Sequence, residues 1–105
     1  MEIDGIVVMT ESGSTARIVA HFRPTVNIFA FSPHLTICRQ MTLLWGITSV
    51  LMDECLTTDD MLVNAEKLLL VNQYINKGET FILTAGIPIG VSGATNMLKI
   101  QKIKE

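Results

Sequence analysis

Two stretches rich in glycine and in hydroxyl side chains are the parts of this sequence best suited to binding an anion. The first spans residues 10–15, and the second, residues 84–96, holds three glycines, one proline, one serine and two threonines. Free backbone N–H groups, hydroxyls and little side-chain bulk suit a phosphate. The candidate ligands in the first stretch are the hydroxyls of Thr10, Ser12, Ser14 and Thr15 and the N–H of Gly13. Both stretches are equally compatible with ordinary turns and a Ser/Thr helix cap.

No arrangement of side chains predicts catalysis or metal binding. His21 and His34 are separated and have no supporting acid or nucleophile, and no carboxylate pair or Ser/His/Asp set stands out. Neither a Walker A motif nor a GxGxxG fingerprint is present. Residues 53–55, Asp-Glu-Cys, are too few for a metal centre. We therefore assign no catalytic residue and no metal ligand.

The composition predicts one soluble cytoplasmic domain over residues 1–105. Hydrophobic residues make up 49% and charged residues 17%, a balance that favours a packed core. The net charge of −2 gives no basic field for nucleic acid. Met1 is followed by acidic residues rather than a signal peptide, and no apolar run approaches the roughly 18 residues of a membrane span. The mean hydropathy of +0.42 indicates surface that packs against another subunit or domain.

Hydrophobic periodicity predicts alternating strands and helices. We expect Ser32 to cap the second helix with Pro33 in its first turn, and Trp45 to be a packing residue. That helix should turn Leu35, Cys38, Met41 and Thr42 inward. The third helix should be capped by Thr57 or Thr58 and ended by residues 76–78. The expected strands are residues 5–10, 26–31, 47–52, 80–84 and 95–103, and the first two helices are residues 15–22 and 33–44.

This order of elements predicts an α/β fold: a three-layer sandwich with a five-stranded, mostly parallel sheet and helices on both faces. No helix separates the last two strands, so the fifth should be antiparallel to the fourth and lie at the sheet edge. Ligands of such sheets bind at the carboxyl ends of the strands. If the first and fourth strands are neighbours, both glycine-rich stretches face one crevice.

Five segments, in this order, resemble the C-terminal domain of pyruvate kinase, particularly its bacterial members. They are residues 10–16, 23–24, 39–40 with 44–47, 57–62, and 85–90 with 92–96. The likeness extends from about residue 5 to residue 103.

The resemblance implies an allosteric effector site in which the Thr-x-Ser-Gly-x-[Ser/Thr] loop binds a phosphate. It would make Thr10, Ser12, Gly13, Ser14 and Thr15 phosphate ligands, and it would place Gly90, Ser92, Gly93 and Ala94 in a closing loop. The family's catalytic barrel, which holds phosphoenolpyruvate, Mg²⁺, K⁺ and ADP, has no counterpart here. The resemblance therefore implies no cofactor and no phosphoryl transfer by this chain alone. It also implies a homodimer through helices and the last edge strand, and a tetramer for a complete enzyme.

Departures from the family bear on the effector. Members that bind fructose 1,6-bisphosphate often carry Lys or Arg in the first loop, where Glu11 and Ser14 stand here. The Trp and Arg that hold a second phosphate are replaced by Thr57 and Asn64 or their neighbours. A sugar monophosphate or AMP therefore fits better than a bisphosphate. Two alternatives remain, a purely structural assembly module with a silent site and a stand-alone homologue with its own small activity.

Overall fold

The computed structural model describes residues 3–10, 13–21, 25–53, 57–85 and 97–103. Its strands are β1 (Gly5–Met9), β2 (Asn27–Ser32), β3 (Ile47–Leu51), β4 (Thr80–Ala85) and β5 (Met97–Lys102). Its helices are α1 (Ser14–His21), α2 (Leu35–Met41) and α3 (Thr58–Val71).

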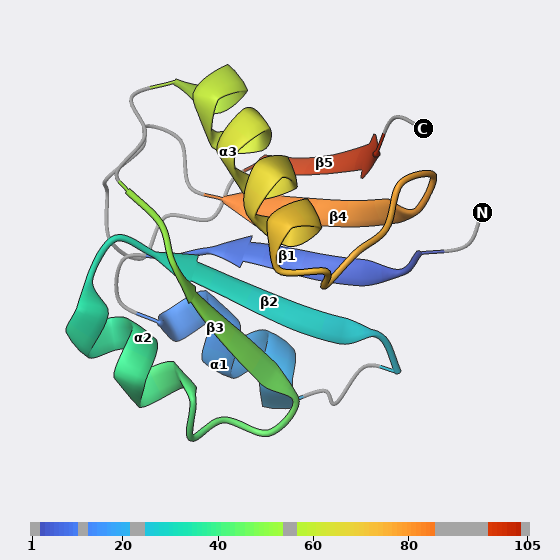
Figure 1. Ribbon diagram of the computed structural model, residues 1–105. Coiled ribbons are helices and arrows are strands. Elements are labelled where there is room, and N and C mark those ends of the chain that lie inside the picture. The colour runs from blue at the N-terminus through green and yellow to red at the C-terminus, as the bar shows by residue number, and fades with distance from the viewer. Residues whose placement is uncertain (1–2, 11–12, 22–24, 54–56, 86–96, 104–105) are drawn as a thin grey trace.

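The strands form one sheet in the order β3-β2-β1-β4-β5 (Figure 1). β1 pairs in parallel with both β2 and β4, β2 pairs in parallel with β3, and β4 pairs antiparallel with β5. The predicted α/β fold with an antiparallel last strand at the edge is confirmed. The neighbouring position of β1 and β4, which the crevice required, is confirmed as well.

Two hydrophobic cores lie on opposite faces of the sheet, because side chains alternate along each strand. Val7 of β1 and Phe29 of β2 join the core beneath α3, together with Leu69 of that helix. Their neighbours Val8 and Ile28 join the core beneath α1 and α2, with Ala16. Figure 1 shows α3 in front of the sheet and the other two helices behind it. The predicted arrangement of helices on both faces is therefore confirmed.

The second helix begins later and ends earlier than predicted. Ser32 is the last residue of β2, and its Oγ accepts a 3.2 Å hydrogen bond from the His34 N–H instead of capping the helix. The seven-residue α2 buries Cys38 and Met41 as predicted, but Leu35 is 50% exposed and Thr42 is exposed. Because α2 has only seven residues, about two turns, only Cys38 and Met41 are buried on it.

Two aromatic residues also lie differently from expectation. Trp45 is 57% exposed, so it is not a core packing residue. Helix α3 ends at Val71 rather than near Asn76, which leaves Tyr74 in the following turn. There its ring stacks on Phe29 with a centroid separation of 5.1 Å. No helix among the described residues has the length and apolar character that crossing a bilayer demands.

Candidate functional site

The turn that leads from β1 into α1 is braced by the side chain of Thr10. Its Oγ1 accepts a 2.8 Å hydrogen bond from the Gly13 backbone N–H, and its own N–H donates to the Phe31 carbonyl over 3.0 Å. Thr10 is only 9% exposed. A hydroxyl that accepts one bond keeps its own proton to donate. Thr10 can therefore brace the turn and still offer a donor to an anion.

Gly13 occupies a backbone conformation that favours glycine, with φ of +85°. The Gly13 N–H, a predicted phosphate donor, instead donates its hydrogen bond to Thr10 in the structure. The next backbone donors along the chain are the N–H groups of the first turn of α1. The first intrahelical bond runs from the Arg17 N–H to the Gly13 carbonyl, 3.0 Å long. Such N-terminal groups precede the helical hydrogen-bond ladder and carry the positive end of the helix dipole.

The remaining predicted ligands are only partly described. Ser14 is the first residue of α1, and Thr15 follows it as a half-buried residue. Ser12 and the predicted closing loop, with Gly90, Ser92, Gly93 and Ala94, lie outside the described residues. The structure thus brings Thr10 and Gly13 into direct contact at the start of the helix that carries Ser14 and Thr15.

The strands place the origins of both glycine-rich stretches at one end of the sheet. Val8 of β1 lies opposite Thr84 of β4 in a parallel register. The chain leaves β4 after Ala85, and it leaves β1 just before Thr10. Because the two strands are parallel neighbours, these exits point in the same direction, as the ligand crevice of an open α/β sheet requires.

Arg17 is a charged residue near this turn that the sequence analysis did not select. Its Nη1 lies 3.5 Å from the position that a Cβ would occupy on Gly13. The family's bisphosphate-binding members carry their cation inside the loop, whereas Arg17 lies one turn into α1. The available signal was helical geometry, because long side chains on a helix point back toward its N-terminus.

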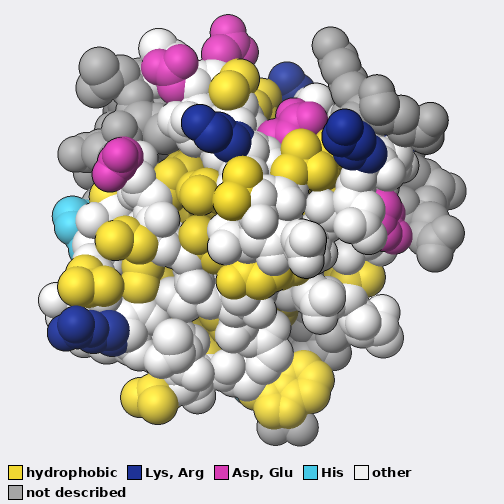
Figure 2. Space-filling view, viewed as in Figure 1, with side chains coloured by type: hydrophobic (Ala, Val, Ile, Leu, Met, Phe, Trp, Pro, Cys, Tyr) yellow, Lys and Arg dark blue, Asp and Glu magenta, His cyan; other side chains and the backbone are white. Residues whose placement is uncertain are grey.

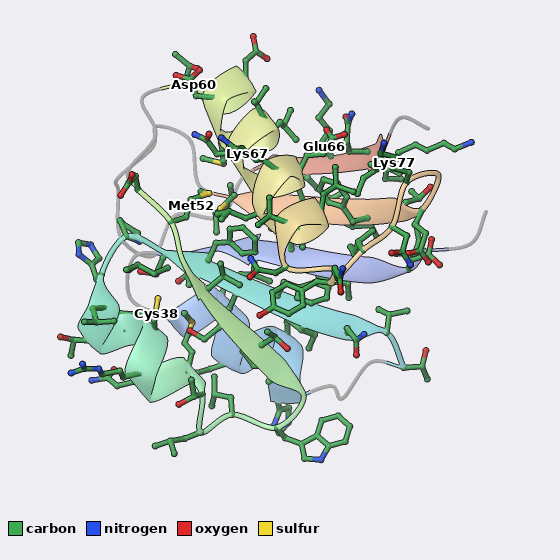
Figure 3. The ribbon with its side chains drawn as sticks, in the orientation of Figure 1. Cys38, Met52, Asp60, Glu66, Lys67 and Lys77 are labelled. Atoms are coloured by element: carbon green, nitrogen blue, oxygen red, sulfur yellow. The ribbon has the colours of Figure 1, made fainter. Side chains whose placement is uncertain are left out.

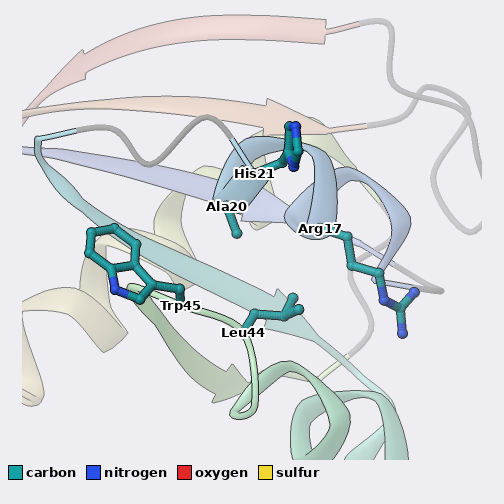
Figure 4. Close-up of a pocket in the computed structure, with 5 residues that line it drawn as sticks. All are labelled: Arg17, Ala20, His21, Leu44 and Trp45. Carbon is teal, nitrogen blue, oxygen red and sulfur yellow. The ribbon is translucent and has the colours of Figure 1, made fainter.

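Arg17 also lines a pocket of about 260 Å³. The pocket lies between α1 and the turn that follows α2, and its other lining residues are Ala20, His21, Leu44 and Trp45 (Figure 4). In this view the Arg17 side chain extends away from Trp45. Arg17 is thus the residue that links the pocket to the turn around Gly13.

The start of α3 carries negative charge, unlike the start of α1, where Arg17 is a cation. Thr57 is its N-cap, and the Thr57 side chain accepts a 3.1 Å hydrogen bond from the Asp60 N–H. Asp59 and Asp60 are exposed in the first helical turn, and Figure 3 shows Asp60 there, with Glu66 and Lys67 farther along α3. This end of α3 therefore presents carboxylates, which repel a phosphate.

The described residues include one free thiol and no grouped metal ligands. Within the described ranges, no three His, Cys, Asp or Glu residues are grouped to hold a metal ion. Cys38 is a buried free thiol on α2, labelled in Figure 3, and its Sγ lies 3.5 Å from the carbonyl oxygens of Ser32 and Val50. It is packed as a small apolar side chain with weak donor contacts.

Comparison with known proteins identifies the family. Residues 1–101 match the family described as the alpha/beta domain of pyruvate kinase. A pyruvate kinase of Staphylococcus saprophyticus is 39% identical over 103 residues, which is 98% of this chain and 18% of the relative. One of Clostridium acetobutylicum is 34% identical over 104 residues, 99% of this chain and 22% of the relative. One of Staphylococcus aureus is 37% identical over 103 residues, again 98% and 18%.

The chain spans about a fifth of the length of these curated relatives. The matched residues contain the turn at Thr10, the three helices, the four parallel strands and all of the fifth strand except Lys102. The predicted resemblance is confirmed: this chain belongs to the pyruvate kinase family and corresponds to its C-terminal alpha/beta domain.

Proposed function

We propose that this chain is a regulatory domain that binds a phosphorylated effector at the turn between β1 and α1. The observation that carries the proposal is the bond from the Gly13 N–H to Thr10 Oγ1, which fixes the start of α1 at the carboxyl end of β1. A helix start held in this place directs its N–H groups toward the crevice of the sheet. The phosphate would accept hydrogen bonds from these groups and from the hydroxyls of Ser12, Ser14 and Thr15.

The effector in this proposal carries one phosphate, as a sugar monophosphate or AMP does. A second phosphate would need cations near the start of α3, and that place holds Asp59 and Asp60. Thr57, which stands where bisphosphate-binding members have a larger ligand, already accepts the Asp60 N–H. Each missing charge-assisted hydrogen bond lowers affinity by about 1.5–3 kcal/mol. A bisphosphate would therefore gain little from its second phosphate.

Phosphoryl transfer from phosphoenolpyruvate to ADP belongs, in this proposal, to the part of the relatives that the chain does not match. The effector would act on that reaction by binding one quaternary state more tightly than another. Mg²⁺ and K⁺ would be needed in the catalytic part and not in this one. The domain would work in the cytoplasm, as part of glycolysis.

Self-association through β5 is the second role that a specific observation favours. β5 is an edge of the sheet, and Leu98 and Ile100 on it are 69% and 48% exposed. An edge strand with apolar side chains invites pairing with another strand. We infer that two copies of the domain associate there. A domain that associates through β5 but binds no effector would be a purely structural module. A measurement of effector binding therefore distinguishes a regulatory domain from a structural one.

The test is thermal unfolding of the chain with ribose 5-phosphate, AMP, fructose 1,6-bisphosphate or inorganic phosphate. A ligand that binds only the folded state at 100 times its Kd stabilises it by about 2.7 kcal/mol. We expect AMP or ribose 5-phosphate to raise the Tm more than inorganic phosphate does. Ser12→Ala and Thr15→Val should remove this shift, whereas Thr48→Val, a threonine on β3, should keep it.

Two outcomes would contradict the proposal. No shift beyond that of inorganic phosphate would leave the chain as an assembly module. A larger shift with fructose 1,6-bisphosphate than with the monophosphates would overturn the choice of a single phosphate.

A further inference from the structure

We propose that one face of β4 and β5 is a docking surface for an amphipathic helix from the part of a pyruvate kinase that this chain does not match. Four residues form the surface, which we call the open face: Ile82 and Thr84 of β4 and Leu98 and Ile100 of β5. The proposal does not depend on the effector site.

The register of the sheet places these four side chains on the face that α1 and α2 cover elsewhere. Val8 of β1 packs beneath those helices and lies opposite Thr84, and Thr84 lies opposite Leu98. The same ladder pairs Ile82 with Ile100. Side chains directly opposite one another in a sheet point to the same face. The open face is therefore the continuation, across β4 and β5, of the surface beneath α1 and α2.

No described helix covers this continuation. The core beneath α1 and α2 takes strand residues from β1, β2 and β3 and, within the described ranges, from neither β4 nor β5. Leu98 and Ile100 are 69% and 48% exposed, whereas Phe81 and Leu83 on the other face of β4 are fully buried beneath α3. Figure 1 shows α1 and α2 behind β2 and β3, away from β4 and β5. Space-filling Figure 2 shows the α3 side, where apolar side chains are interspersed with charged ones.

An amphipathic helix matches this surface in length and charge. β4 has six residues and so extends about 20 Å, which a helix of about 13 residues covers. Lys102 follows Ile100 on the same face of β5 and lies opposite Thr80 at the start of β4. A cation stabilises the C-terminal end of a helix. The docked helix should therefore place its apolar side on the open face and its C-terminus near Lys102.

The relatives identify the source of the helix. The chain corresponds to their C-terminal domain and spans 18–22% of their length, so most of their remaining sequence enters at the start of β1. That start lies beside β4, because the Asp4 N–H donates to the Thr80 carbonyl over 2.8 Å and Asp4 Oδ2 accepts the Thr80 N–H over 2.9 Å. Thr80 is also the residue opposite Lys102. A helix that ends near Lys102 can thus lead directly into β1.

This helix and a second copy of the chain would use different parts of β5. Hydrogen bonds between strands lie in the plane of the sheet, whereas the open face points out of that plane. A helix on the open face therefore leaves the backbone edge of β5 accessible for strand pairing.

The experiment compares the chain with a fusion that adds, at its N-terminus, the segment preceding the matched region of the Staphylococcus saprophyticus pyruvate kinase. A segment of about 30 residues is long enough for the helix and a connection. Ile100→Cys and Lys99→Cys are made separately in a Cys55→Ser background, in which the other cysteine, Cys38, is buried. Lys99 is the matched control, because it is exposed on the same strand but lies opposite Leu83 on the other face.

The first readout is the rate at which a maleimide labels each introduced thiol. We expect Ile100→Cys to react about 10-fold or more slowly in the fusion than in the chain alone, because labelling then requires the helix to open. Lys99→Cys should react at the same rate in both. Equal rates for Ile100→Cys in the two proteins would overturn the proposal. So would equal slowing at both positions, which indicates strand pairing along β5 rather than a helix on one face.

The second readout is thermal unfolding. The fusion should have a Tm about 5 °C or more above that of the chain alone. Leu98→Asp should remove this rise, whereas Lys99→Asp should keep it. A rise that survives Leu98→Asp would show that the added segment binds elsewhere. If labelling of Ile100→Cys in the chain alone slows as the protein concentration increases while that of Lys99→Cys does not, a second copy covers the open face and the proposed occupant is wrong.

Discussion

The Gly13 N–H donates a 2.8 Å hydrogen bond to Thr10 Oγ1, and this one bond joins the end of β1 to the start of α1. Both residues are buried, so the bond is protected from water. Three substitutions in the described part of the chain test this bond, the backbone at Gly13 and the edge strand β5. Two of them test what stabilises this turn, and the third tests whether the edge strand β5 mediates self-association.

Thr10→Val should destabilise the fold, because it leaves the buried Gly13 N–H without its acceptor at nearly constant side-chain volume. An unsatisfied buried donor costs about 1–3 kcal/mol, and for a domain of this size each kcal/mol lowers the Tm by roughly 4–8 °C. Thr10→Ser keeps the hydroxyl and should lose much less. Urea unfolding followed by circular dichroism measures both. Equal stabilities for the Val and Ser variants would show that this bond does not brace the turn.

Gly13→Ala should cost about 1–2 kcal/mol, because its φ of +85° lies in the left-handed region. The added Cβ would meet Arg17, Ile37 and Met41 at 3.5–3.6 Å, which is ordinary contact. Gly46→Ala is the matched control, since Gly46 has a φ of +71° and nothing within 4 Å of its Cβ position. We expect the two free energies of unfolding to fall by similar amounts in chemical denaturation. A much larger loss for Gly13→Ala would mean that the space beside Arg17 is closed to a methyl group.

Leu98→Lys should weaken self-association of the chain. It places a charge on the exposed edge strand β5, where a second strand would pair, and natural edges use lysine to prevent such pairing. Leu43→Lys changes the same residue type at a position that is 89% exposed in the turn after α2 and should have no effect. Sedimentation velocity over a range of concentrations gives the oligomeric state. A wild-type chain that stays monomeric at every concentration would rule out the association.

The local sequence pattern was sufficient to predict which elements form. Runs of β-branched residues and helical periodicity placed the five strands and three helices, because these signals depend on neighbours within a few residues. The cap at Thr57 was predicted for the same reason, since a threonine followed by two aspartates satisfies a helix N-terminus locally. Five segments in fixed order, beginning with residues 10–16, also identified the family, and the match over residues 1–101 confirms it.

The ends of the helices and the exposure of single side chains were decided by tertiary packing. Ser32 continues β2 because its strand pairs with β3 as far as Leu51, which delays α2 to Leu35. Helix α2 ends at Met41, so Trp45 lies in the turn that follows it and is exposed. Local propensity does not predict helix ends that depend on pairing between strands far apart in the sequence.

The sequence by itself determined the elements, the α/β class and the residue types of the candidate site, since each depends on local pattern and chemistry. Only the tertiary structure decided that β1 lies between β2 and β4, that the Gly13 N–H belongs to Thr10, and that Arg17 reaches this turn from α1. The strand order joins residues far apart in the chain, and the two contacts at the turn, which span three and four residues, depend on where β1 ends and α1 begins.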